Sequence, residues 1–95
     1  MHIEIRIFPG MAGQGGRLTA RRSELMQVVA DMRELHAFEL AETREGLALV
    51  VVCASPAEAT ECCRRFAVWS ATRMPDLEWR GAFAVGGSVI TRLER

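Results

Sequence analysis

The chain has 95 residues, of which 49% are hydrophobic and 25% charged, and this suits one globular domain spanning residues 1–95. Twelve acidic and twelve basic residues cancel, so no net field draws the chain to nucleic acid or to an anionic membrane surface. The longest apolar run, Leu47 to Ala54, is too short to cross a bilayer, and the first residues lack a signal-peptide core, so we expect a cytoplasmic protein.

The first strand and the first helix follow from the spacing of apolar residues. Residues 2–8 alternate, which predicts a strand with Ile3, Ile5 and Ile7 on one face. Residues 18–34 carry apolar side chains at helical spacing, with acidic and amide side chains opposite them, so we expect one helix over this range.

Four glycines lie between these two elements, in the stretch IFPGMAGQGGR of residues 7–17. Gly16-Arg17 stands where a phosphate-binding loop requires Gly-Lys-Ser/Thr, so the lysine and the metal-binding hydroxyl are missing. A crossover loop is the favoured interpretation. The alternative is a lid, or a helix N-terminus that meets an anionic ligand beside Arg17 and Arg21.

The second half of the chain predicts a hairpin, a helix and a last strand. Residues 36–43 and 47–54 read as strands joined by a tight turn at 44–46, where Gly46 supplies a positive φ. Ser55-Pro56-Ala57-Glu58 has the residues of a capping box, and the helix it starts runs to Met74, before Pro75. Residues 79–93 form the last strand region, with a bulge or bend expected at Gly86-Gly87.

This order of elements predicts an α+β, ferredoxin-like βαββαβ fold with a four-stranded antiparallel sheet. The third strand is apolar on both faces, whereas two helices cover only one face of such a sheet. An uncovered apolar face is unusual on a monomer, so we expect a homodimer packed sheet to sheet. A different protein as the partner is the rival interpretation.

Charged and sulfur-containing side chains give fewer signals. Glu4 and Arg6 share one face of the first strand, and buried charges need partners, so we expect them to pair with each other, with the dimer mate or with a ligand. Cys62 and Cys63 point about 100° apart on a helix, which does not suit one metal ion. We expect no metal site, and we interpret Cys53, Cys62 and Cys63 as small buried hydrophobic residues.

Several stretches together resemble the dimeric α/β barrel superfamily, particularly its antibiotic biosynthesis monooxygenase-like domains. The first strand ends in Pro-Gly, and LHAFELAETREGLALVVVCASPAEATE is similar to the family's hairpin and capped second helix. RRFAVWSATRMPDL is similar to the tryptophan-bearing part of that helix, and AFAVGGSVITRLE to the closing strand. The resemblance covers nearly the whole chain and implies a homodimer whose sheets close into a barrel, with a ligand pocket in each subunit between sheet and helices.

The resemblance also implies a choice of activities. Oxygenase members act on polycyclic aromatic phenols without a cofactor, using tryptophan, asparagine, histidine, tyrosine and arginine; Trp69 lies where family tryptophans occur, but this chain has no asparagine or tyrosine. Haem-degrading members ligate iron through a histidine on the second helix, and residues 56–74 contain none. We therefore expect no cofactor.

The chemistry most compatible with these residues is the binding of a small aromatic molecule. Histidine is a common general base, so His36 and His2 are candidate bases, although histidines at strand ends are usually just partly exposed. Trp69 suits stacking on an aromatic ligand, or serves only as a core residue. Trp79 and Arg80 rim a cavity or pack at the dimer edge.

The functional hypothesis is a cofactor-independent oxygenase with His36 and Trp69 as catalytic residues. Its ligand-binding residues are Phe38, Phe66, Arg6, Glu4 and Arg80. The alternative is a non-catalytic homodimeric regulatory or protein-interaction module, which the lack of a convincing polar constellation favours.

Overall fold

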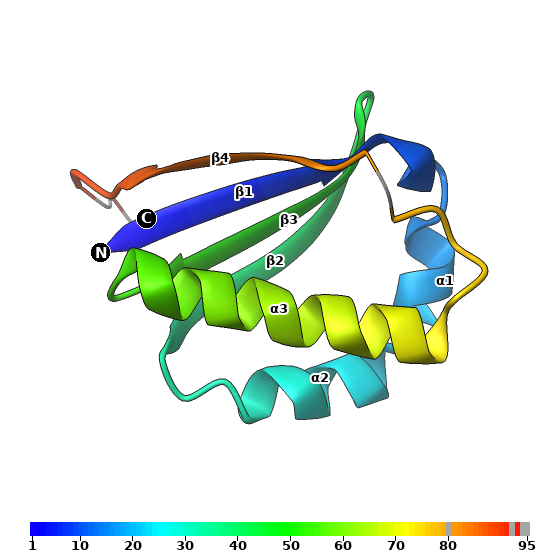
Figure 1. Ribbon diagram of the computed structural model, residues 1–95, viewed down its shortest axis with the longest axis horizontal. Coiled ribbons are helices and arrows are strands. Elements are labelled where there is room, and N and C mark those ends of the chain that lie inside the picture. The colour runs from blue at the N-terminus through cyan, green and yellow to red at the C-terminus, as the bar shows by residue number, and fades with distance from the viewer. Residues whose placement is uncertain (80, 92, 94–95) are drawn as a thin grey trace.

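The computed structural model describes residues 1–79, 81–91 and 93. The elements along the chain are β1 (His2–Phe8), the 3₁₀ turn η1 (Pro9–Met11), α1 (Gly15–Thr19), α2 (Arg22–Ala30), β2 (Leu35–Thr43), β3 (Gly46–Cys53), α3 (Pro56–Arg73) and β4 (Phe83–Ser88). The sheet has the order β2-β3-β1-β4, and every neighbouring pair is antiparallel (Figure 1). This confirms the predicted ferredoxin-like βαββαβ arrangement.

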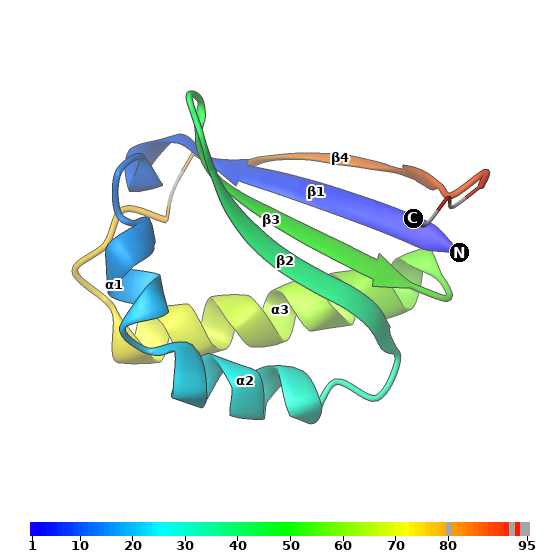
Figure 2. The same ribbon diagram turned by 180° about the vertical axis from the view of Figure 1, so that it is seen from behind.

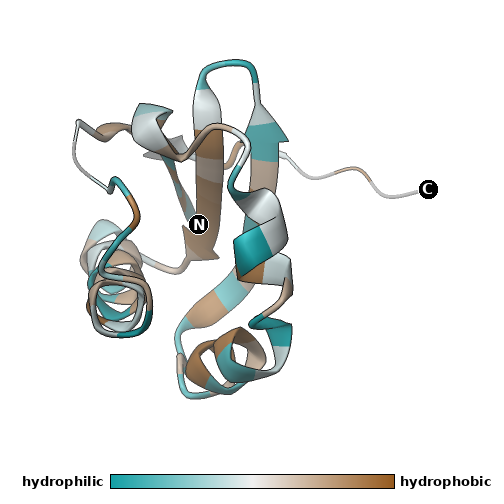
Figure 3. Ribbon diagram, turned by 90° about the vertical axis from the view of Figure 1, so that its right-hand side faces the viewer, coloured by the Kyte–Doolittle hydropathy of each residue, from teal (hydrophilic) through white to brown (hydrophobic). Residues whose placement is uncertain are grey.

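The core lies between the sheet and the helices. Because side chains alternate along a strand, Leu47, Leu49, Val51 and Cys53 of β3 all point towards α3, and each is at most 2% exposed. Phe66 of α3 lies among them and is 1% exposed. In Figure 3 the strand β3 is coloured as hydrophobic along most of its length.

The opposite face of the sheet is apolar and uncovered. The register places Ile5 of β1 beside Val50 of β3 and Val85 of β4, all on this face, with Ile3 and Ile7 on either side. Val85 is 63% exposed and Phe83 is 51% exposed. Figures 1 and 2 show α2 and α3 on the same side of the sheet, so no described element covers the other side.

Local signals account for the hairpin and for the start of α3. Gly46 has a φ of 135°, as predicted, and a Cβ there would collide with the backbone oxygen of Phe8. Ser55 Oγ accepts a hydrogen bond from the Glu58 N–H at 3.3 Å, which confirms the serine cap. The other half of the predicted capping box, a hydrogen bond from the Ser55 N–H to the Glu58 carboxylate, is absent among the described contacts, and Glu58 Oε2 is buried without a partner.

The predicted helix over 18–34 is wrong in its continuity. The chain forms two shorter helices, and Arg21 between them has φ −107° and ψ 23°, outside the α-helical region. The break allows α1 to place Leu18 in the core while α2 runs beside α3, although no residue of α2 is fully buried.

The predicted last strand is too long, and its bulge is wrong. β4 begins at Phe83, so Trp79 lies in the loop before it, while Arg80 and Arg92 fall outside the described residues. The register with β1 continues without a shift through Gly86 and Gly87. Gly86 instead makes room for His2, since a Cβ there would lie 3.2 Å from Cε1 of that ring.

Candidate functional site

An inner cavity of about 340 Å³ lies between α3 and the β1 side of the sheet. Its apolar walls include Phe8, Leu49, Phe66 and Trp79, and its polar lining comes from Arg6, Cys63 and Ser70. This volume is at the lower end of the range of small-molecule sites, and a mostly apolar wall with a few polar groups is typical of them.

Aromatic rings determine the shape of this cavity. The Phe66 ring lies 5.5 Å from the Trp79 ring and 6.5 Å from the Phe8 ring, measured between centroids. Trp79 meets Phe8 edge to face at 5.3 Å, and its indole N–H donates to the Met74 carbonyl at 3.3 Å. These three contacts therefore hold Trp79 in place, and its ring closes one side of the cavity.

A three-residue polar cluster lies at the cavity wall. Glu4 Oε2 accepts a hydrogen bond from Arg6 Nε at 2.7 Å and another from Cys63 Sγ at 3.2 Å. The Glu4 side chain is only 12% exposed, and that of Arg6 is 32% exposed. Of the three partners that the sequence left open for Glu4 and Arg6, the structure shows the pairing with each other.

The protonation states in this cluster follow from burial and hydrogen bonding. Burial acts to raise the pKa of Glu4, but the hydrogen bonds from Arg6 and Cys63 favour the carboxylate and leave its pKa below the ordinary 4.5. Burial, together with the hydrogen bond to Glu4, raises the pKa of the Cys63 thiol to about 12. At neutral pH the cluster is therefore a carboxylate held between a guanidinium and a neutral thiol.

Arg6 retains hydrogen-bonding capacity. Glu4 takes the Nε proton, and neither terminal amino group of Arg6 has a hydrogen-bond partner within the described residues. Because Arg6 also lines the cavity, the arrangement is suited to hold an anionic or strongly polar oxygen of a bound molecule.

The structure brings some of the predicted site residues together and separates others. Phe66 and Arg6 line the inner cavity, and Glu4 is bonded to Arg6. Phe38 and Trp69 contact the Phe66 ring at 5.8 Å and 6.0 Å, but each lines a different hollow.

His36 does not line this cavity, and Arg80 is not among the residues that the structure describes. His36 is exposed at the start of β2, beside a register shift between Leu35 and Ala37. Among the described residues, neither histidine lines the inner cavity. Arg80 follows Trp79 directly but is outside the described part of the chain.

Cys63 and Ser70 are site residues that the sequence analysis missed. Ala59, Cys63, Phe66 and Ser70 recur at i, i+4, i+7 and i+11, and all four are buried. The helical spacing of these four residues was therefore the one sequence feature that could have placed Cys63 and Ser70 at the site. This spacing was overlooked because Ser70 is polar, whereas its neighbour Trp69 is apolar and was the stronger candidate for an inward-facing residue.

An outer cleft of about 700 Å³ separates α1 and α2 from β2. Its lining is mostly apolar, with Leu25, Met26 and Val29 on one side and Phe38 and Leu40 on the other. The cleft lies at the β2 edge of the sheet, whereas the Glu4–Arg6 pair lies on β1. It adjoins the glycine-rich segment, because Gly15 and Gly16 line it.

The contacts of the glycine-rich segment do not favour an anion site. Arg17 pairs with Asp76 at 2.8 Å, and Arg21 pairs with Glu24 at 2.7 Å. The Gly15 N–H donates to a carboxylate oxygen of Glu42 at 2.7 Å. The groups expected to meet a phosphate are thus already engaged, and the segment connects β1 to the helices.

The donor set of the inner cavity does not fit haem. Haem iron is bound by histidine, thiolate, methionine or tyrosinate side chains, and among the described residues that line the cavity Cys63 is the one of these types. Its raised pKa keeps it a protonated thiol that donates to Glu4. Within the described residues there is also no cluster of three or more side chains suited to a metal ion, and none of the helices is both long and apolar enough to span a membrane.

Comparison with known proteins gives matches only at the level of structure. No protein-family model matches the chain, and no curated protein matches its sequence. The haem-degrader MhuD from Mycobacterium tuberculosis, solved with two haems in its active site, matches with a TM-score of 0.70 and 16% identity over 99% of this chain and 100% of that one.

Two further solved structures show the same fold. A dimeric ferredoxin-like protein from an uncultured marine organism has a TM-score of 0.67 and 9% identity, over 99% of this chain and 97% of that one. A mutant of SnoaB, a cofactor-independent oxygenase from Streptomyces nogalater, has a TM-score of 0.60 and 10% identity, over 99% and 96%. The predicted likeness to antibiotic biosynthesis monooxygenase-like dimeric α/β barrels is thereby confirmed for the fold.

Proposed function

We propose that this chain is a homodimeric small-molecule-binding domain whose inner cavity takes an aromatic ligand bearing an acidic or hydroxyl group. The observation that carries the proposal is the position of Arg6, which presents terminal amino groups without described partners at the wall of an aromatic-lined cavity. Stacking against Phe66 and Trp79 selects a flat ring, and Arg6 selects a polar oxygen on that ring.

The reaction we propose to test is oxygenation of that ligand without a cofactor. The fold is shared with SnoaB, a cofactor-independent oxygenase, and the aromatic cavity supports an aromatic substrate. The lowered pKa of Glu4 makes it a weak base, so the geometry supports binding more strongly than catalysis. Catalytic roles for His36 and Trp69 and a cytoplasmic location stay predictions.

The homodimer is part of the same proposal. The open sheet face carries Ile3, Ile5, Val52, Phe83 and Val85, and a second copy related by two-fold symmetry presents the same apolar surface in return. The ferredoxin-like neighbour described as dimeric supports this assembly. Sheet-to-sheet packing leaves the inner cavity on the far side of the sheet, one in each subunit.

A fluorescence titration tests ligand binding. Hydroxylated polycyclic aromatics added to the wild-type protein should quench Trp79, so the signal should persist in Trp69→Phe and be lost in Trp79→Phe. Arg6→Gln should weaken binding about 10- to 100-fold, by removing the charged donor to the ligand oxygen. Arg33→Gln, which alters an exposed arginine elsewhere, is the matched control and should bind as the wild type does.

Oxygen uptake in the same mixtures separates binding from turnover. Consumption that depends on ligand and is lost in Arg6→Gln supports the oxygenase proposal. Saturable quenching without consumption supports the alternative, a non-catalytic regulatory or interaction module, which is favoured by the absence of both histidines from the described cavity lining. No quenching across a broad panel contradicts the aromatic ligand itself.

A further inference from the structure

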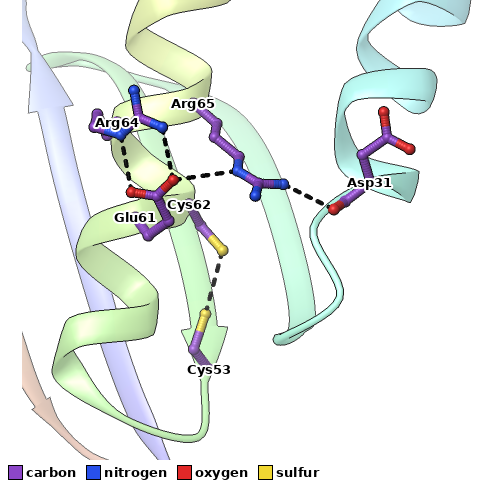
Figure 4. Close-up of polar contacts among 6 residues, drawn as sticks. All are labelled: Asp31, Cys53, Glu61, Cys62, Arg64 and Arg65. Atoms are coloured by element: carbon purple, nitrogen blue, oxygen red, sulfur yellow. Dashed lines mark hydrogen bonds and ion pairs between the residues drawn. The ribbon is translucent and has the colours of Figure 1, made fainter.

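Two cysteines approach each other behind the inner cavity. Cys53 is the last residue of β3, and Cys62 lies in the second turn of α3, on the face that meets the sheet. Their sulfur atoms are 3.6 Å apart, and the two residues are 0% and 1% exposed (Figure 4). Nothing in the proposed ligand site uses either thiol.

We propose that Cys53 and Cys62 form an oxidation site that closes an intramolecular disulfide linking β3 to α3, while the adjacent Cys63 remains a thiol. A disulfide has an S–S distance of about 2.05 Å, so the two sulfur atoms must approach by roughly 1.5 Å. They already face each other across the contact between sheet and helix. The approach therefore needs an adjustment of side chains and of the first turns of α3, with no change of fold.

The oxidant that suits this site is a hydroperoxide, the smallest being hydrogen peroxide, because the thiols are buried. One cysteine, as its thiolate, attacks a peroxide oxygen and becomes a sulfenic acid, releasing hydroxide. The second sulfur then attacks the sulfenic sulfur, forms the S–S bond and displaces a second hydroxide. The two thiol protons convert both hydroxides to water, so two thiols and one peroxide give one disulfide and two waters.

Burial makes this oxidation slow but selective. Burial and the neighbouring Cys62 thiol raise the pKa of Cys53 to about 12, and burial raises the pKa of Cys62 as well, so reaction depends on local opening of the β3–α3 junction. When the junction opens, each of these thiols has the other beside it. Cys63, by contrast, is held by its hydrogen bond to Glu4 on the cavity side of the helix.

The disulfide also has a consequence for the candidate site. Cys62 and Cys63 are consecutive in α3, so a shift of Cys62 towards β3 alters the position of Cys63 relative to Glu4 and Arg6. Oxidation is therefore expected to change ligand affinity. This coupling rests on the proposed function, whereas formation of the disulfide does not.

Peptide mapping of the oxidised wild-type protein tests the proposal without any substitution. Cleavage after Glu58 and Glu61 places Cys53 in one peptide and Cys62 with Cys63 in another. After treatment with hydrogen peroxide, the two peptides should be joined until a reductant is added, and the intact chain should have lost two hydrogen atoms. The chain should run as a monomer on a denaturing gel without reductant, since the bond lies within one subunit.

Variants and stability complete the test. Cys63→Ala should still form the link, whereas Cys53→Ala and Cys62→Ala should not. The oxidised wild type should melt on the order of 10 °C above the reduced protein, since the bond restricts the unfolded chain. Free Cys53 and Cys62 thiols after prolonged peroxide treatment, or a link through Cys63 instead, would overturn the proposal. Those outcomes leave the ligand titration unaffected, so failure of the disulfide is distinguishable from failure of the ligand site.

Discussion

Glu4 is the residue on which the candidate site depends. It stands on the helix-facing side of β1, where β3 places Leu49, Val51 and Cys53 beside it. A carboxylate in such surroundings is costly without partners, and Arg6 and Cys63 supply them. A strand that otherwise completes an apolar core therefore keeps one ion pair, and this pair positions the Arg6 guanidinium at the cavity.

Substitution of Glu4 should change how the stability of the protein depends on pH. The folded-state pKa of Glu4 is depressed, so its stabilising contribution is present above its ordinary pKa of 4.5 and is lost as the pH falls through the lower folded value. Glu4→Gln should therefore lose less stability than the wild type between pH 6 and pH 3, in urea unfolding at each pH. A pH dependence identical to that of the wild type would contradict the assigned contacts.

The pairing of Glu4 with Arg6 was predictable because strand alternation places both on one face. The contribution of Cys63 was not, because the contact joins residues 59 positions apart and depends on how α3 lies across β1. The same limit explains why His36 looked like a candidate base. Its place at a strand end is visible in the sequence, whereas its exposure is a property of the packed sheet.

At the scale of the elements, α3 is the helix whose start is best defined by the local sequence. Ser55 caps it, Pro56 occupies its first turn, and its inward residues make up much of the core.

Ser55→Ala should lower the free energy of unfolding by about 1 kcal/mol, because the Glu58 N–H loses its acceptor. Thr60→Ala, at an exposed position in the same helix, is the control for urea unfolding and should change stability by less than about 0.5 kcal/mol. Equal losses in both variants would contradict the assigned cap.

The elements that were predicted less well are those determined by distant contacts. The split between α1 and α2 accompanies an ion pair from Arg17 to Asp76, a residue that follows α3. The late start of β4 accompanies the packing of Trp79 against Phe8 and Phe66, which holds the preceding loop against the core. Neither contact can be recognised from the local sequence. The spacing of apolar residues alone therefore predicted one long helix and a last strand that was too long.

At the scale of the whole molecule, the two faces of the sheet have different roles. One face meets α3 and forms the core and the inner cavity. The other carries the isoleucines of β1, Val50 and Val52 of β3, and the exposed Phe83 and Val85 of β4. The two apolar faces of β3 were visible in the sequence, and they led to the prediction of both an open face and a homodimer. The structure shows the open face.

A pair of matched substitutions separates this face from the rest of the surface. Val85→Glu places a charge on the open sheet face that forms the proposed interface and should weaken self-association at least 100-fold, because a carboxylate without a partner is costly to bury. Val68→Glu is the control, since Val68 is also exposed, at 54%, but lies on α3, on the other side of the sheet. It should leave self-association unchanged.

Sedimentation velocity of the wild-type chain at micromolar concentration is the most direct test of the proposed homodimer. A species with the mass of two chains, retained in Val68→Glu and reduced to one chain in Val85→Glu, is the predicted result. A stable species of one chain in the wild-type protein would contradict the pairing of the open sheet faces, and with it the homodimer of the proposed function.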